Sequence, residues 1–588
     1  MKHLLIGYDF KTADVENALS FIKSFQEVAV QGIPRTFGNF QLSYFRNVTS
    51  LQLSPNDLHL LLQRLGGCFE KLPRLVSLEL RVTMDPIEIR LMKDIVQKWR
   101  ILRSGKHASL KLSISISNRN EEKLYEYYTD LENTISNNRN ILNIKTSILI
   151  TESPSPTASG IFSTLANLSD STRIENFTSD AVGWVNNICS LEHLTNICCP
   201  SKLCLRMKTL CLLVGSLDAS LFDTLPGTLQ SLDLQMHSSY DIPSIKIPLS
   251  LRKLTVFARK VPEILNKKEL TDLTEANIEF VKKPPHLPPE DWPPYDAFEV
   301  IQESIDNLPS CTIKLKLTNT QFHETRKQLS FRNLPQLEDL EMNYGCLDHS
   351  VSLLPLKKLC VSAHAISGLL PNTLMSLDLD SRWWDLDTDV PSFFQNVILP
   401  LNNLKGLRFC IGNIESPVVA DDDDTFSRRV RSSGICNSLE SLNINFENVA
   451  LSTFWQSFIS PLQNLSELTL ALEYHADLVV NDWPPQLHFL TVDFNCADRY
   501  SDEDEDENYS RLELGGISKS SLKLVKIAGS GNITIKEGST DVDQCIILSY
   551  DKKPGAQFRK SIDKIGFESI DYSNIDKVLI KGNWRFYD

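Results

Sequence analysis

The stretch LPNTLMSLDL, residues Leu370 to Leu379, has a near twin in LPGTLQSLDL, residues Leu225 to Leu234. Eight of the ten letters agree across 145 positions, and looser copies occur as IPLSLRKLTV (Ile247 to Val256) and WPPQLHFLTV (Trp483 to Val492). The alternating Leu-x-Leu end of each copy is typical of a short strand with one buried face. A phrase that recurs in this way indicates an array of repeats rather than a single compact core.

The same L-x-x-L-x-L frame recurs along much of the chain. Besides the two opening copies, strong frames are Val48/Leu51/Leu53, Leu75/Leu78/Leu80, Leu251/Leu254/Val256, Leu337/Leu340/Met342, Leu356/Leu359/Val361, Leu404/Leu407/Phe409, Leu439/Leu442/Ile444, Leu465/Leu468/Leu470 and Leu487/Leu490/Val492. Weaker frames are Leu110/Leu112, Met207/Leu210/Leu212, Leu273/Ala276/Ile278, Ile313/Leu315 and Leu522/Val525/Ile527.

This frame resembles the leucine-rich repeat, whose signature is LxxLxLxxNxL. One copy matches in full, as Val48, Leu51, Leu53, Asn56 and Leu58. Because the asparagine is absent from most other copies, the repeats are irregular. The resemblance implies an α/β fold: a curved solenoid, or horseshoe, with a parallel concave sheet and helices on the convex side.

The spacing between frames predicts where those helices lie. Leu51 and Leu78 are 27 residues apart, which leaves room for a helix, whereas Leu340 and Leu359 are only 19 apart, which favours extended or 3₁₀ backbone. Helical patterns occur at 12–28, 55–67, 85–105 and 121–135. We therefore expect the helices mainly in the N-terminal third.

The predicted organisation follows from these spacings. Helix-backed repeats are expected over 1–205, tighter irregular repeats over 206–500, an acidic loop at 501–510, and C-terminal repeats or a cap over 511–588. Two loops interrupt the tight repeats, one proline-rich at 282–296 and one acidic then basic at 415–434.

Composition narrows the class of protein. A chain of 588 residues with 42% hydrophobic and 23% charged residues is typical of an ordered protein. The net charge of −14 argues against nucleic-acid binding. Ten of the acidic residues lie in Asp421–Asp424 and Asp502–Glu507, so the net charge of the rest of the chain is near −4. We expect no signal peptide and no membrane span. Thirteen cysteines, mostly in apolar segments, fit reduced thiols in the cytoplasm or nucleus.

No motif predicts catalysis, a cofactor or a metal. Cys189, Cys198, Cys199, Cys204 and Cys211 fall close together, but no two of them have C-x₂-C spacing, so core packing is the better interpretation. The sequence contains no HExxH, GxxxxGK[ST] or GxSxG motif.

Residues between the leucines of each strand are expected to point away from the core and to line the concave face, where a protein partner would bind. Trp383 and Trp384 follow a strand, and one of them is expected to be an exposed anchor unless both pack under a loop. The acidic and amide bias of the set favours a basic or polar partner, with plain solvation as the alternative. The candidates are Asp233, Glu341, Asn343, Asp378, Asp380, Trp383, Trp384, Arg408, Asn443, Asn445, Thr491 and Asp493.

The irregular repeats look like the substrate-binding region of fungal-type F-box/leucine-rich-repeat proteins, which implies a partner-binding subunit of a ubiquitin-ligase complex and an adaptor as one partner. The first 60 residues lack an LP-x-E/D-I-L opening, and the only LPPE is Leu287–Glu290. A stand-alone scaffold is the alternative. A GTPase-activating protein of the Ran type fits less well, because that family has regular repeats and a terminal acidic run.

Overall fold

The computed structural model describes residues 3–6, 27–30, 49–64, 72, 74–83, 85–103, 109–117, 121–152, 154–176, 188, 190–196, 207–214, 225–236, 244–258, 260–280, 297–318, 327–342, 346–361, 366, 368–379, 393–411, 423–447, 454–473, 477–494, 511–514, 524–529, 532–535, 545–550 and 581–582. These residues fall into two compact units, Met1–Leu273 (unit 1) and Thr274–Asp588 (unit 2). The loops predicted at 282–296 and 501–510 lie outside the described residues.

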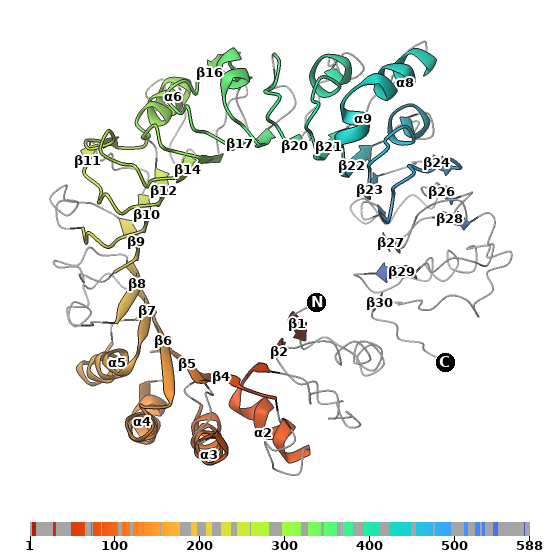
Figure 1. Ribbon diagram of the computed structural model, residues 1–588. Helices are drawn as coiled ribbons and strands as arrows, with labels where there is room; N and C mark the ends of the chain where they lie inside the picture. The colour runs from red at the N-terminus through yellow and green to blue at the C-terminus, as the bar shows by residue number, and fades with distance from the viewer. Residues whose placement is uncertain are drawn as a thin grey trace, which may run out of the picture. The chain divides into compact units, whose positions relative to one another are not determined.

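Unit 1 is built on strands that pair in parallel with their neighbours (Figure 1). The α/β class and the parallel sheet of the sequence prediction are confirmed. The strands are β1 (His3–Ile6), β2 (Glu27–Val30), β3 (Ser50–Leu53), β4 (Ser77–Thr83), β5 (Ser109–Ser117), β6 (Leu142–Ile150), β7 (Ser171–Asn176), β8 (Leu191–Asn196), β9 (Thr209–Val214), β10 (Ser231–Met236) and β12 (Lys253–Ala258).

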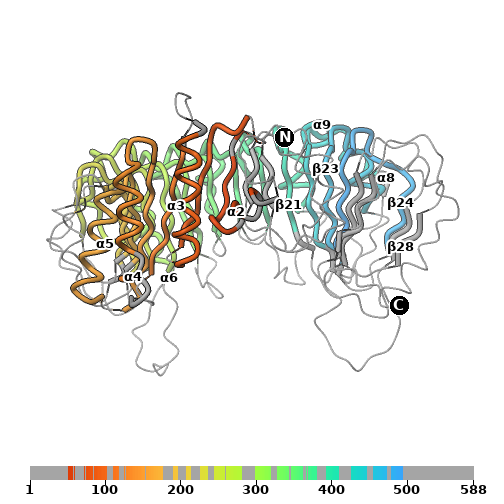
Figure 2. The backbone as a smooth tube through the Cα atoms, turned by 90° about the horizontal axis from the view of Figure 1, so that it is seen from below, coloured from red at the N-terminus to blue at the C-terminus, as the bar shows by residue number. Residues whose placement is uncertain are grey.

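Four helices alternate with strands β3 to β7 and lie side by side, each touching the next (Figures 1 and 2). Helices α2 (Pro55–Arg64), α3 (Pro86–Arg103) and α4 (Glu121–Asn137) were all predicted, because each carries an apolar face of period 3.6. Helix α5 (Pro156–Leu168) was not predicted; Ser155 caps it by accepting a hydrogen bond from the Ala158 amide at 3.1 Å.

The helix predicted at 12–28 is wrong at its end, because Glu27 and Val28 belong to strand β2, and the rest lies outside the described residues. Val28 pairs in register with Leu51 of β3. An alternation of period two and a helical period both fit such a short apolar run, which explains the error.

Unit 1 contains two leucine columns rather than one. The first joins Leu51, Leu78, Leu110 and Leu142 on β3 to β6. The second joins Ile116, Ile148, Ile174, Leu194, Leu210, Leu232 and Leu254 on β5 to β12. The two columns are offset by six residues along β5 and β6, which are each nine residues long and take part in both.

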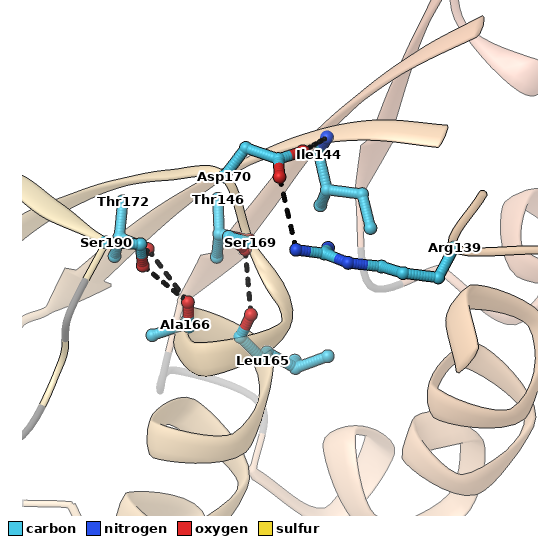
Figure 3. Close-up of polar contacts among 9 residues, drawn as sticks. All are labelled: Arg139, Ile144, Thr146, Leu165, Ala166, Ser169, Asp170, Thr172 and Ser190. Carbon is cyan, nitrogen blue, oxygen red and sulfur yellow. Dashed lines mark hydrogen bonds and ion pairs between the residues drawn. The ribbon is translucent and has the colours of Figure 1, made fainter. Parts of the chain in front are cut away.

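Hydroxyl groups fill the core where the two columns meet (Figure 3). Thr146 and Thr172 pair in register on β6 and β7, and both are buried. The Ser169 hydroxyl donates to the Leu165 carbonyl at 2.7 Å and contacts the Thr146 hydroxyl, so Thr146 is the donor in that contact. The Ser190 hydroxyl donates to the Ala166 carbonyl at 2.6 Å. These contacts satisfy the carbonyls at the end of α5 that the helix leaves open.

The strands of unit 2 also pair in parallel. They carry one uninterrupted buried column, formed by Ala276, Leu315, Leu340, Leu359, Leu377, Leu407, Leu442, Leu468 and Leu490. The strands that carry it and follow it are β14 (Glu275–Phe280), β15 (Lys314–Thr318), β17 (Asp339–Met342), β19 (Lys358–Val361), β20 (Ser376–Leu379), β21 (Gly406–Ile411), β22 (Ser441–Glu447), β23 (Glu467–Glu473), β25 (Phe489–Phe494), β27 (Leu524–Gly529), β29 (Cys545–Tyr550) and β30 (Lys581–Gly582).

Where the structure describes them, the tight repeats have little helix, as their spacing predicted. Residues His349–Leu353 form a 3₁₀ turn, η7, and short second strands pair in parallel. In unit 1 these are β11 (Ser244–Ile245) with β13 (Glu263–Ile264); in unit 2 they are β16 (Gln328–Leu329) with β18 (Cys346–Leu347), and β26 (Arg511–Leu514) between β24 (Asp477–Val480) and β28 (Asn532–Ile535). Helix α6 (Ala297–Asp306) was not predicted.

The loop predicted at 415–434 is wrong over its second half. Residues Asp423–Ser432 form helix α8, and Ile435–Ser438 form a further turn, α9. Helix α8 buries Phe426 and Val430, four residues apart on one face. Beside it, two π-helical turns, η9 (Phe394–Ile398) and η10 (Trp455–Ile459), bring together the rings of Phe394, Phe454 and Phe458, with centroids 5.1 to 5.9 Å apart.

Candidate functional site

The strand residues that alternate with the buried columns form a second face of each sheet, which we call the polar face. In unit 2, eight of them pair in register on successive strands: Lys316, Glu341, Cys360, Asp378, Arg408, Asn443, Thr469 and Thr491. Five predicted binding residues therefore lie in one row. Asn445 and Asp493 lie in the neighbouring row, with Ala471 between them.

The remaining predicted residues are not in this row. Asp233 belongs to unit 1, on β10. Asn343, Asp380, Trp383 and Trp384 lie outside the described residues.

Charges on the polar face of unit 2 alternate in sign from strand to strand. β14 carries Glu275 and Glu279, β15 Lys314 and Lys316, β17 Asp339 and Glu341, β19 Lys358, β20 Asp378 and β21 Arg408. Three pairs that are directly opposite in register form ion pairs: Lys316–Glu341 at 2.6 Å, Arg408–Asp378 at 3.5 Å and Lys358–Asp339 at 4.0 Å. Opposite charges across neighbouring strands stabilise that register.

These alternating charges on β14 to β21, which we call the charge ladder, change the interpretation of the acidic residues. Glu341 and Asp378 contribute to the acidic bias from which a basic partner was expected, yet each has a cation of the chain itself beside it. Because the charges on these strands balance one another, this part of the face has little net charge to attract a partner of either sign.

The ladder ends at β22, and the polar face becomes mostly uncharged. Asn443, Asn445, Thr469 and Thr491, which we call the amide–hydroxyl patch, are each partly exposed. Phe489, at the start of β25 on the same face, is 43% exposed. An exposed aromatic ring beside amides and hydroxyls is a composition typical of protein-binding surfaces. The face positions of these strands also hold four acids, which are Glu447 on β22, Glu467 and Glu473 on β23, and Asp493 on β25.

The polar face of unit 1 holds a different arrangement around Asp233. Asp233 pairs in register with Cys211 of β9, and its Oδ2 accepts a long hydrogen bond from Gln235 Nε2 at 3.4 Å. Its Oδ1 is buried and has no hydrogen-bond partner among the described residues. Burial raises the pKa of the Asp233 carboxyl above its ordinary value.

Two neighbouring side chains of unit 1, Cys211 and His193, carry reactive groups with shifted pKa values. Burial, and then the adjacent Asp233 carboxylate, raises the pKa of the Cys211 thiol to about 12, so it stays protonated at neutral pH and is a poor nucleophile. Burial, and then the charge of Arg173, lowers the pKa of His193, whose Nε2 lies 3.2 Å from the Thr195 hydroxyl.

No metal cluster occurs within the described ranges, where no three His, Cys, Asp or Glu side chains are placed to hold an ion. Cys189, Cys198, Cys199 and Cys204 fall outside those ranges. In the part of the chain that the structure describes, no helix is both long and apolar enough to cross a bilayer.

Two features of the polar face were missed by sequence reasoning. Lys316 comes from a weak frame and was not considered, although it pairs with a predicted residue. Phe489 directly precedes Leu490 in a strong frame, so its position before a column leucine was a usable signal for exposure.

Comparisons with known proteins add no relationship to these observations. No protein-family model matches the chain, and a search among curated proteins returns no match.

Proposed function

We propose that the chain is an irregular leucine-rich-repeat protein that recognises another protein through the polar face of unit 2. The observation that carries this proposal is the end of the charge ladder at β22, beyond which the amide–hydroxyl patch and the exposed Phe489 share one face. Amides and hydroxyls each supply a donor and an acceptor, so they can match main-chain and uncharged polar groups of a partner.

The narrower role rests on the sequence resemblance. The chain acts, in this proposal, as the substrate- or partner-binding subunit of a ubiquitin-ligase complex in the cytoplasm or nucleus, and not as an enzyme. Its repeats, which range from helix-backed to tight, support the likeness to F-box/leucine-rich-repeat proteins. A stand-alone scaffold would use the same face without an adaptor.

The test is affinity capture from the source cell with mass spectrometry, using the full chain and two variants. Asn443→Arg with Thr469→Arg places two bulky charges in the amide–hydroxyl patch and should abolish capture of the specific partner. Gln456→Arg is the control, because Gln456 is exposed on η10, away from the polar face.

Recovery of an adaptor and a cullin supports the ligase role, and a defined complex without them supports a scaffold. If the patch variant captures the same proteins as the wild type, the polar face of unit 2 is not the recognition surface.

A further inference from the structure

Helix α3 of unit 1 presents isoleucines to solvent at both of its ends. Ile87 is 61% exposed and Ile101 is 69% exposed. They are fourteen residues apart, so they lie at nearly the same angle about the helix axis, about four turns and 21 Å from each other. Between them on the same stripe lie Arg90, Asp94 and Lys98, all exposed.

The opposite side of α3 is apolar and buried, and its burial stabilises the helix. Ile89, Met92, Val96 and Trp99 are buried on that side, each 2% exposed or less. The outer isoleucines therefore add nothing to this core. Single apolar residues on a surface are ordinary. Two isoleucines on the same solvent-facing stripe of one helix, one near each end, are less so.

The charge of α3 is opposite to that of the chain as a whole. The chain has a net charge of −14, yet the exposed charged side chains described on α3 are Arg90, Lys93, Lys98, Arg100 and a single acid, Asp94. The helix's other acid, Glu88, is buried and accepts hydrogen bonds from Thr83 at 2.7 and 2.8 Å.

Neighbouring residues neutralise only part of this charge. Lys93 lies 3.7 Å from Asp130 of α4, and Arg100 lies 3.5 Å from the Asn138 amide oxygen. Arg90 and Lys98 make no ion pair or hydrogen bond with the residues that the structure describes. Two cations between two isoleucines are thus available to a ligand.

A protein fits this surface better than a lipid bilayer does. Helix α4, which touches α3, carries Glu121, Glu122, Glu126, Asp130 and Glu132 in its sequence, and these acids would repel an anionic membrane (Figure 2). Asp94 at the centre of the stripe would also have to enter the interface between lipid and water. A bound polypeptide can be narrow enough to lie along α3 alone, away from the acids of α4, and it can place an uncharged side chain opposite Asp94.

We propose that the outer stripe of α3, formed by Ile87, Arg90, Lys98 and Ile101, is a second docking surface, which takes an acidic amphipathic segment of a protein partner. The segment carries two apolar side chains about 21 Å apart for the isoleucines and carboxylates between them for the cations. This surface is separate from the polar face, so it does not depend on the function proposed above.

The test uses a synthetic helical peptide of Ala and Glu, about 18 residues long, with two leucines fourteen positions apart. Fluorescence anisotropy with the full chain should show binding that weakens with added salt. A peptide of the same composition with its leucines seven positions apart should bind at least about fivefold more weakly, because only one leucine can reach an isoleucine.

Arg90→Glu with Lys98→Glu should lower the affinity at least about tenfold, and Ile87→Ser with Ile101→Ser about fivefold. The charge-matched control is Arg252→Glu with Lys268→Glu, two exposed cations elsewhere in unit 1. Circular dichroism checks that each variant keeps its fold.

Three results would overturn the proposal: equal losses in the stripe and control variants, equal binding of the two peptides, or binding to phosphatidylserine vesicles in place of the peptide. The polar-face variant Asn443→Arg with Thr469→Arg should bind the peptide normally, which separates this proposal from the proposed function.

Discussion

The Lys316 ammonium and the Glu341 carboxylate lie 2.6 Å apart on adjacent strands that pair in register. Both side chains keep contact with water, being 45% and 30% exposed, so the pair is partly screened. A double-mutant cycle with Lys316→Ala and Glu341→Ala should give a coupling of about 0.2–1 kcal/mol in urea unfolding. The swapped pair, Lys316→Glu with Glu341→Lys, should recover most of the stability lost by either single reversal. A coupling well above this range would mean that the ladder is a major source of stability.

Leu377 and Asp378 are consecutive residues with opposite surroundings. Leu377→Asp should destabilise by at least the roughly 2–5 kcal/mol of a buried Leu-to-Ala change, because it also places a carboxylate in a column that offers no partner. Asp378→Ala removes a partly exposed ion pair and should cost less than about 1 kcal/mol. Thermal melts that shift equally for the two variants would contradict the assignment of the two faces.

Gly434 lies where only a hydrogen side chain fits. A Cβ there would come within 2.8 Å of the Asn402 Cα, so the turn between α8 and α9 would have to move away from the backbone of a neighbouring turn. Gly434→Ala should therefore destabilise by about 1–3 kcal/mol, as overpacking does. Gly227→Ala is the control, since a Cβ there meets nothing within 4 Å, and it should change the melting temperature little. A harmless Gly434→Ala would show that α8 and α9 are loosely held.

The raised pKa of Asp233 links stability to pH. A carboxyl whose pKa is higher in the folded state binds its proton more tightly there, so its contribution is favourable at low pH. That contribution is lost as pH rises from about 4, the ordinary carboxyl value, through the raised folded value. Asp233→Asn removes this dependence, so the variant should gain stability relative to the wild type between pH 4 and pH 7. Parallel melting curves across that range would show that the carboxyl is well solvated.

The strands that could be predicted are those in which leucine occupies every column position, such as Leu340, Leu359 and Leu377. Strands β6 to β8 were missed, although LNIKTSILI alternates with period two, because Thr146 and Thr172 occupy buried positions of β6 and β7 where the frame expects leucine. These hydroxyls can be buried because groups at the C-terminal end of α5 accept hydrogen bonds from them. Such tertiary contacts cannot be read from the local sequence pattern.

Helix α8 was mistaken for a loop because its buried face is only Phe426 and Val430, in a segment otherwise made of charges and serines. The candidate site was predicted in part for a related reason. Alternation alone identified Glu341, Asp378, Arg408 and Asn443 as facing away from the leucines. The pairing of Glu341 with Lys316 depends on which strands are neighbours and in what register, and neither follows from the residues themselves.

The offset along β5 and β6 also determines how unit 1 comes apart. In a repeat array each strand is held mainly by its immediate neighbours, so a column is a natural cooperative block. β5 supplies Leu110 and β6 supplies Leu142 to one block, and the same strands supply Ile116 and Ile148 to the other, so these two strands belong to both blocks. Their backbone amides should remain protected from solvent exchange until both blocks open, whereas strands such as β3 and β10 lose protection with one. A repeat could be gained or lost on either side of β5 and β6, but a deletion of both strands would leave two arrays that no longer meet.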